Sequence, residues 1–237
     1  RTISQLCQDI LEDLADSEHA DLVWGLAQYT NDHSVAKLLT SMLRIRQNGA
    51  FSSSKSDIWA SFGLPAEFGE DNLIADYMTP QDVDLVKTIA AEMAHGSVTD
   101  QKGAAILDGV QDLTVKSLSL VQQVFLNKSA PFTAKIGKLP TKALSTGVLA
   151  PYMDQINDLI GRAYDAKQAS LSLHAAQKSY VLHQLGVVFL PEYERQKQIR
   201  GWLDFDDLIL KTRDLLSKTP VADWVLYRLD GGISHIL

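Results

Sequence analysis

Apolar residues recur every three or four positions along most of the chain, and this spacing restricts what the chain can fold into. The first such stretch contains Ile3, Leu6, Cys7, Ile10, Leu11 and Leu14. The spacing places apolar side chains on one face of an α-helix, whereas a half-buried strand needs alternation with a period of two. No strand-like alternation of any length occurs in the first 126 residues. We therefore predict a mainly α-helical protein, an irregular bundle of several helices.

The helices predicted before residue 127 are short and are separated by turn residues. After the helix over 3–15 they cover about 18–29, a segment carrying Val35 to Leu43, 58–62, 73–78, 79–95, 98–109 and 112–126. Asn31, Asp32 or Ser34 is expected to cap the third of them, and Thr79 followed by Pro80 forms a typical helix start. Residues 47–55 have the composition of a loop.

A long helical stretch is predicted from Gly147 to Gly201. Because Pro191 removes a helical hydrogen bond and crowds the preceding turn, we expect a kink or an interruption near Val187. The elements predicted after Gly201 are a helix over about 205–217, a short helix from Thr219-Pro220 to Leu229, a turn at 231–232 and one short strand over 233–237.

The stretch Gly201-Trp-Leu-Asp-Phe-Asp-Asp-Leu-Ile-Leu210 has the features of a helix start. Asp204 is placed to act as the N-cap, its carboxylate accepting a hydrogen bond from the backbone N–H of Asp206 or Asp207. Asp206 and Asp207 add negative charge to the first turn, where the helix dipole favours it. Leu203 and Leu208 have the spacing of a hydrophobic staple. One apolar face of this helix is predicted to comprise Phe205, Leu208, Ile209, Leu215 and Leu216.

An aspartate-rich metal site is the alternative interpretation of these three acids. Such a site usually needs a further acid one turn later, where Leu210 and Lys211 stand, so helix capping is the better explanation. The six histidines lie in separate segments or on opposite helix faces and form no ligand set. The chain also lacks a Gly-x-Ser-x-Gly elbow and a phosphate-binding Gly-x-x-x-x-Gly-Lys-Ser/Thr loop. We expect no catalytic residue, no metal site and no bound cofactor in these 237 residues.

Charge is distributed unevenly over the chain. The formal net charge is -7, but residues 1–126 carry -10 and residues 127–153 carry +4, with no acid in the second block. The four positive charges are Lys128, Lys135, Lys138 and Lys142. Because residues 127–145 contain two prolines and a glycine, we predict an extended and exposed basic loop there.

The basic loop has two interpretations. Its lysines are candidates for contacts with nucleic-acid phosphates, with Phe132 available to stack on a base or to support the loop. Alternatively, the lysines only keep a solvated loop soluble. Arg195, Lys197 and Arg200 are candidates for extending the same basic track, or they solvate the long helix.

The C-terminal fifth of the chain carries a resemblance to a known family. Tyr193 and Lys197, then Leu-Asp-Phe-Asp-Asp-Leu-Ile from Leu203, then a tail ending in a short apolar strand, resemble the UvrD/Rep-type superfamily 1 DNA helicases. The tail from Trp224 to Leu237 resembles in particular the AddA subunit of bacterial AddAB helicase–nucleases. The match is fairly specific over residues 193–237 and looser over the remainder.

The resemblance implies a parent protein that unwinds DNA ends in double-strand break repair, using ATP and Mg²⁺ and an AddB-like nuclease subunit. Residues 1–200 would be the helical insertion called 1B, which lies along duplex DNA, so the resemblance favours DNA contact by loop 127–145. Residues 201–237 would be an incomplete piece of the ATPase core, 1A, and the rest of the motor would be a partner. The strand near Ile233 would continue into the Asp-Glu-x-x-Asp motif, so this chain alone should be inactive.

A membrane partner is not expected. The longest uncharged apolar run near the end, Ser179 to Pro191, has 13 residues, whereas a bilayer-spanning helix needs about 17–25. Cys7 alone excludes an internal disulfide and fits a reducing compartment. The resemblance implies a bacterial cytoplasmic protein associated with the nucleoid. The chain opens with Arg1 and shows no leader, as an internal fragment would. The alternative function is that of a helical adaptor domain whose acidic face in residues 1–126 binds a basic partner.

Overall fold

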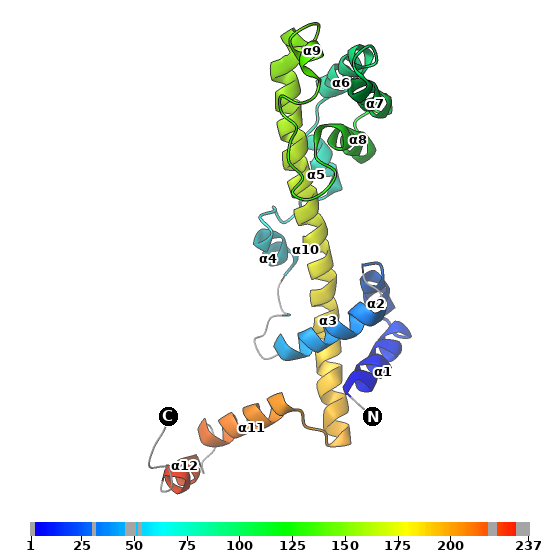
Figure 1. Ribbon diagram of the computed structural model, residues 1–237. Helices are drawn as coiled ribbons and strands as arrows, with labels where there is room; N and C mark the ends of the chain where they lie inside the picture. The colour runs from blue at the N-terminus through cyan, green and yellow to red at the C-terminus, as the bar shows by residue number, and fades with distance from the viewer. Residues whose placement is uncertain (1–2, 30–31, 46–50, 52–53, 218–221, 231–237) are drawn as a thin grey trace. The chain divides into compact units, whose positions relative to one another are not determined.

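The computed structural model is mainly helical, which confirms the fold class predicted from the periodicity (Figure 1). It describes residues 3–29, 32–45, 51, 54–217 and 222–230. Its α-helices are α1 (Ile3–Ala15), α2 (Ala20–Ala27), α3 (Asp32–Ile45), α4 (Lys55–Ser61), α5 (Glu70–Ala75), α6 (Pro80–Met93), α7 (Val98–Leu107), α8 (Val115–Phe125), α9 (Lys142–Ser145), α10 (Met153–Arg200), α11 (Phe205–Ser217) and α12 (Ala222–Asp230). A 3₁₀ turn, η2 (Ala150–Tyr152), precedes α10.

Strand pairing among the described residues is limited to one isolated antiparallel bridge, between Leu126 and Ala134. The strand predicted over 233–237, the turn at 231–232 and the helix start at Thr219-Pro220 lie outside the described residues.

The long helix α10 passes through Pro191 without a break, so the interruption expected near Val187 is wrong. Pro191 and Val187 both lie on the exposed side of the helix, where water can bond the carbonyl that loses its N–H partner. On the opposite side, Phe189 and Tyr193 are fully buried, and their rings stack with centroids 6.2 Å apart. Burial of these two rings stabilises the helical path on both sides of the proline.

The chain divides into two compact units, each described here by itself. The first unit consists of residues 1–52 and 181–237, and the second of residues 53–180. Helix α10 therefore contributes residues 153–180 to the second unit and residues 181–200 to the first.

In the second unit, α6, α7 and α8 lie beside the first half of α10 (Figure 1). Their shared core is closed by a fully buried stripe along α10, comprising Ile156, Leu159, Ile160 and Ala163. A neighbouring cluster joins α4 and α5 to the next turns of α10, where Trp59 donates a hydrogen bond to the carbonyl of Phe68 at 2.9 Å. Small residues at Ala166, Ala169 and Ala176 form the α10 side of that cluster.

The buried carboxylate of Asp82 links α6 to α10 in the second unit. Asp82, 4% exposed, starts α6 by accepting hydrogen bonds from the N–H and hydroxyl of Thr79. It also accepts two hydrogen bonds from Arg162 of α10, at 2.6 and 2.8 Å. Burial alone would raise the pKa of Asp82, but the bonds from Arg162 and Thr79 outweigh it and lower the pKa. A bidentate pair of this kind fixes the position of α6 against α10.

In the first unit, α1, α2 and α3 pack beside the second half of α10 (Figure 1). The buried core residues are Leu6, Cys7, Ile10, Leu14, Leu26, Leu39, Met42, Leu43, Phe51, Leu185, Phe189 and Tyr193. Cys7 belongs to this buried core, and burial raises the pKa of its thiol to about 11.

Candidate nucleic-acid interface

The basic segment begins at the end of α8 with a short turn of extended chain. The Leu126–Ala134 bridge closes it, and the N–H of Asn127 bonds to the carbonyl of Thr133 at 3.0 Å. The N–H of Lys135 bonds to the carbonyl of Phe125 at 2.8 Å. These bonds return the chain to the C-terminal end of α8 and give the segment a defined course.

The prediction that this segment is extended and exposed is only partly right. Leu139 and Pro140 are buried, and Leu139 belongs to the core of the second unit. Thr141 then bonds to the fully buried Asp100 through its N–H at 3.0 Å and its hydroxyl at 2.6 Å. Because Asp100 also accepts bonds from Ser97 at the start of α7, one carboxylate caps a helix and anchors the segment.

The four lysines of the segment have different environments. The ammonium group of Lys135 donates a hydrogen bond to the carbonyl of Val124 at 2.8 Å, which satisfies a C-terminal carbonyl of α8. Burial and the nearby charge of Lys128 lower the pKa of Lys135. Lys128, Lys138 and Lys142 are exposed to solvent. Lys135 therefore supports the segment, and the other three are available to a ligand.

A cavity of about 340 Å³ lies between α8, the basic segment and α10. It is lined by Ser119, Gln122, Gln123, Leu126, Asn127, Lys128, Phe132 and Lys167. The ammonium group of Lys167 lies 4.9 Å from the centre of the Phe132 ring. The structure thus brings together the predicted Lys128 and Phe132, and adds Lys167 from α10.

The chemistry of this cavity suits a phosphate beside an aromatic or heterocyclic ring. Lys128 and Lys167 supply positive charge, and the side-chain amides of Gln122, Gln123 and Asn127 supply neutral hydrogen-bond donors. Of these, Gln122 already donates to the carbonyl of Ala163 at 3.2 Å, and Asn127 donates to the Thr133 hydroxyl. Lys167 already covers one face of Phe132, so a base would have to stack on the other face or displace the ammonium group.

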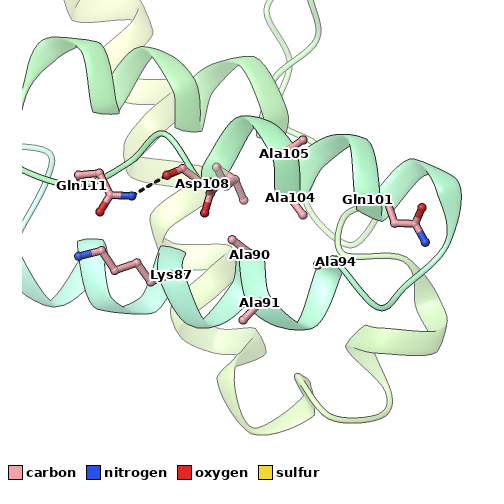
Figure 2. A pocket seen from close by; sticks show the side chains of 10 residues that line it. Lys87, Ala90, Ala91, Ala94, Gln101, Ala104, Ala105, Asp108 and Gln111 are labelled. Atoms are coloured by element: carbon pink, nitrogen blue, oxygen red, sulfur yellow. Dashed lines mark hydrogen bonds between the residues drawn. The ribbon is translucent and has the colours of Figure 1, made fainter.

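A second groove of the same unit has a different character. Figure 2 shows alanines of α6 and α7 facing each other across it, with Lys87, Gln101, Asp108 and Gln111 around them. Its volume is about 460 Å³, and Gln111 donates to the carbonyl of Asp108 at 2.6 Å. The charges of Lys87 and Asp108, the charged residues that line this groove, cancel. The groove therefore does not favour an anionic ligand.

The three predicted basic residues near the end of α10 belong to the first unit, and they do not form a uniform track. Arg195 makes a bidentate pair with Glu192, at 2.6 and 2.7 Å, which raises the pKa of the guanidinium group. Arg200 donates to Gln196 at 2.5 Å and lies 5.6 Å from the centre of the Trp202 ring.

Lys197 has a role that the sequence analysis missed. It is 3% exposed, and its ammonium group bonds to both carboxylate oxygens of Asp207 at 2.7 and 2.8 Å. Asp204 and Glu194 add contacts at 3.2 and 3.1 Å, and the Tyr193 hydroxyl donates to Asp204 at 3.4 Å. In this structure the ammonium group of Lys197 is not available to a phosphate, which corrects its assignment as a DNA-contacting residue.

The predicted capping of α11 is confirmed. The N–H of Asp207 bonds to Asp204 at 2.9 Å, and the N–H of Asp204 bonds back to Asp207 at 2.8 Å. This reciprocal pair is a capping box with aspartate at both positions. Just before it, α10 ends at Arg200 and is followed by Gly201, whose φ of 65° suits glycine. The N–H of Trp202 bonds to the carbonyl of Lys197 at 2.9 Å.

The apolar face predicted for α11 is largely exposed within the described residues. The exposed fraction is 86% for Phe205, 64% for Ile209 and 48% for Leu208. Leu203, the other half of the expected staple, is 55% exposed. Asp206, in the first turn of α11, is partly buried. An exposed apolar helix face of this kind marks a surface that another segment or partner covers.

Within the described ranges, no group of three or more His, Cys, Asp or Glu side chains is placed to hold a metal ion. No helix in those ranges is long and apolar enough to cross a membrane.

Comparisons of the chain with protein-family models, curated proteins and solved structures find no match.

Proposed function

We propose that this chain is part of an AddA-like, ATP-dependent DNA helicase subunit and that its second unit contacts duplex DNA. The observation that carries the DNA contact is the cavity lined by Lys128, Lys167 and Phe132, with the Lys167 ammonium group over the Phe132 ring. The parent would supply ATP and Mg²⁺ binding, the remaining motor domains and the contact with an AddB-like nuclease subunit. This chain would position DNA and brace the motor.

The helicase assignment is supported by how the motif residues meet. Tyr193 and Lys197 stand on α10, whereas Asp204 and Asp207 start α11, yet the four side chains form one contact network. The two parts of the sequence pattern that resembles the helicases are therefore one structural feature. The exposed face of α11 agrees with a larger parent whose ATPase core covers it.

The DNA contact is tested by fluorescence anisotropy with a labelled duplex–single-strand junction at low salt. Each phosphate contact contributes about 0.9 to the slope of log affinity against log salt, so four contacts give at most about -3.6. We expect Lys128→Glu with Lys167→Glu to weaken binding and to reduce that slope by about 2. Lys102→Glu on α7 with Lys116→Glu on α8 makes the same charge change on exposed residues that do not line the cavity, and this double variant is the matched control.

Equal weakening by the control double variant would show that only net charge matters, and unchanged binding by the Lys128→Glu, Lys167→Glu variant would refute the cavity's role. The helicase assignment has a separate test. The gene should encode an Asp-Glu-x-x-Asp motif directly after Leu237, and a stop codon or an unrelated sequence there would overturn it.

A further inference from the structure

The first unit contains an apolar groove formed by α1, α2 and α3, with a volume of about 440 Å³. Its lining residues are Ser4, Cys7, Gln8, Leu11, Glu12, Ala15, Val23, Trp24, Leu26, Ala27, Val35, Leu39 and Thr40. Cys7, Leu26 and Leu39 are buried members of the core, so the core itself forms the floor. Trp24 is 63% exposed although it lines the groove. A large apolar side chain left in solvent beside an apolar groove indicates a contact surface.

The charge on α1 and α2, two of the three helices that form the groove, has one sign, whereas α3 carries Lys37 and Arg44. Residues 3–29 contain six acids and no lysine or arginine. Glu12 lines the groove, Asp9 lies three residues before it on α1, and Asp16 lies four residues after it, just past the end of α1. The apolar floor therefore has an acidic border that attracts cations and repels nucleic acid.

We propose that the groove between α1, α2 and α3 binds a basic amphipathic helix of a partner protein. The apolar face of such a helix would enter the groove with side chains at i, i+3, i+4 and i+7 and cover Trp24. Its lysines or arginines would lie along Glu12 and Asp16. This docking site goes beyond the proposed DNA contact, which uses residues of the other unit, and the two proposals stand or fall separately.

The chemistry of the groove selects against other occupants. A second copy of this chain offers α11 as an exposed apolar helix, but α11 carries three aspartates and only two cations, Lys211 and Arg213. Its charge would repel the acidic border. DNA and other polyanions are repelled for the same reason. A cationic helix satisfies both the apolar floor and the border.

The probe is a labelled synthetic helix of leucines and lysines, with the leucines on one face, added to the full chain. Binding is measured by anisotropy, and a scrambled peptide of the same composition is the control for simple charge attraction. We expect the amphipathic peptide to bind at least tenfold more tightly than the scrambled one. Trp24→Ala and Glu12→Lys should each weaken binding several-fold, whereas Asp84→Lys on α6 of the second unit should not.

Trp24 reports where the peptide binds, because it is exposed to solvent and lines the groove. The saturating amphipathic peptide should protect Trp24 from quenching by acrylamide, measured as the difference in quenched fluorescence between the wild-type chain and Trp24→Ala, and the scrambled peptide should not. Equal affinity for both peptides, or unchanged quenching of Trp24 under saturation, would overturn the proposal. Self-association of the chain that Trp24→Ala abolishes would also overturn it, because the groove would then be a contact between copies.

Discussion

Replacing Lys197 by methionine tests whether the ion network at the start of α11 stabilises the first unit. Methionine keeps an unbranched apolar side chain against Tyr193, whose ring centre lies 5.0 Å from the Lys197 ammonium group. It removes the charge that Asp204, Asp207 and Glu194 share. The perturbation is therefore mainly electrostatic, with little change in packing volume.

The expected cost follows from burial and from the remaining partners. Removing one member of a fully buried ion pair costs about 3–5 kcal/mol, because the other member stays buried without compensation. Here the Asp204 and Asp207 side chains retain 12% and 13% of their exposure, and each still accepts a backbone N–H. We therefore expect Lys197→Met to lower the free energy of unfolding by about 3 kcal/mol, the lower end of that range.

Urea unfolding of the intact chain, followed by circular dichroism and tryptophan fluorescence, measures this loss. Arg195→Met is the matched control, because Arg195 stands two residues earlier on α10 in a surface pair with Glu192. Such an exposed pair contributes little to stability, because solvent screens it. A loss for Lys197→Met no larger than that for Arg195→Met would refute the idea that the network stabilises the unit.

The same variant predicts a dependence on alkaline pH. Burial would lower the pKa of Lys197, but hydrogen bonds with Asp207, Glu194 and Asp204 outweigh it and raise the pKa. A group whose pKa is higher in the folded state contributes its full stability below its unfolded-state pKa, about 10.4 for lysine. That contribution disappears as the pH rises through the folded-state pKa. The stability difference between wild type and Lys197→Met should therefore be constant near neutral pH and shrink above about pH 10.4.

Two further predictions concern the second unit. Arg162→Met leaves the buried carboxylate of Asp82 without its guanidinium partner. Urea unfolding should therefore show a free energy of unfolding lower by about 3 kcal/mol. A decrease below about 1 kcal/mol would contradict the role given to the pair. Asp100→Asn should cost about 2 kcal/mol at neutral pH, because charged bonds to Thr141 and Ser97 become weaker neutral ones. Although burial would raise the pKa of Asp100, hydrogen bonds from Thr141 and Ser97 outweigh it and lower the pKa. The contribution of the Asp100 carboxylate to folding stability is therefore present above about pH 4 and is lost as the pH falls through the folded-state pKa. An acid titration of stability should therefore be flatter for Asp100→Asn than for wild type.

Local signals in the sequence predict most of the helices well. The first helix has the predicted bounds, and α6 begins at Pro80 after Thr79 as expected. Errors of about three residues occur at α4 and α5, which start at Lys55 and Glu70. There the backbone N–H groups of Ser54 and Gly69 donate to the side chains of Asp57 and Asn72 and set the helix start. Such capping bonds leave no hydrophobic periodicity in the sequence.

The candidate site could be predicted only in part, because its remaining members come from distant segments. Lys128 and Phe132 stand out as a cation and an aromatic ring in one loop. Lys167 looks like any surface lysine of a long helix, and only the packing of α8 against α10 brings it to Phe132. Likewise, the position of Asp100 three residues after Ser97 is sufficient to explain it as part of a helix cap. The neighbouring sequence does not indicate that Asp100 also accepts a hydrogen bond from Thr141.

Lys197 shows which signal a sequence can carry for a buried charge. Helices α4, α6 and α7 start with serine or threonine followed three residues later by aspartate, so a hydroxyl is sufficient at the first position of this capping box. Only α11, among the described helices, has aspartate at both positions, and it alone has a buried lysine beside its cap. The second carboxylate exceeds what capping requires, and it is explained by the charge of Lys197, which needs compensation once buried. In this chain, the aspartates at both positions of the capping box, Asp204 and Asp207, therefore indicate that Lys197 faces the cap of α11 and not solvent.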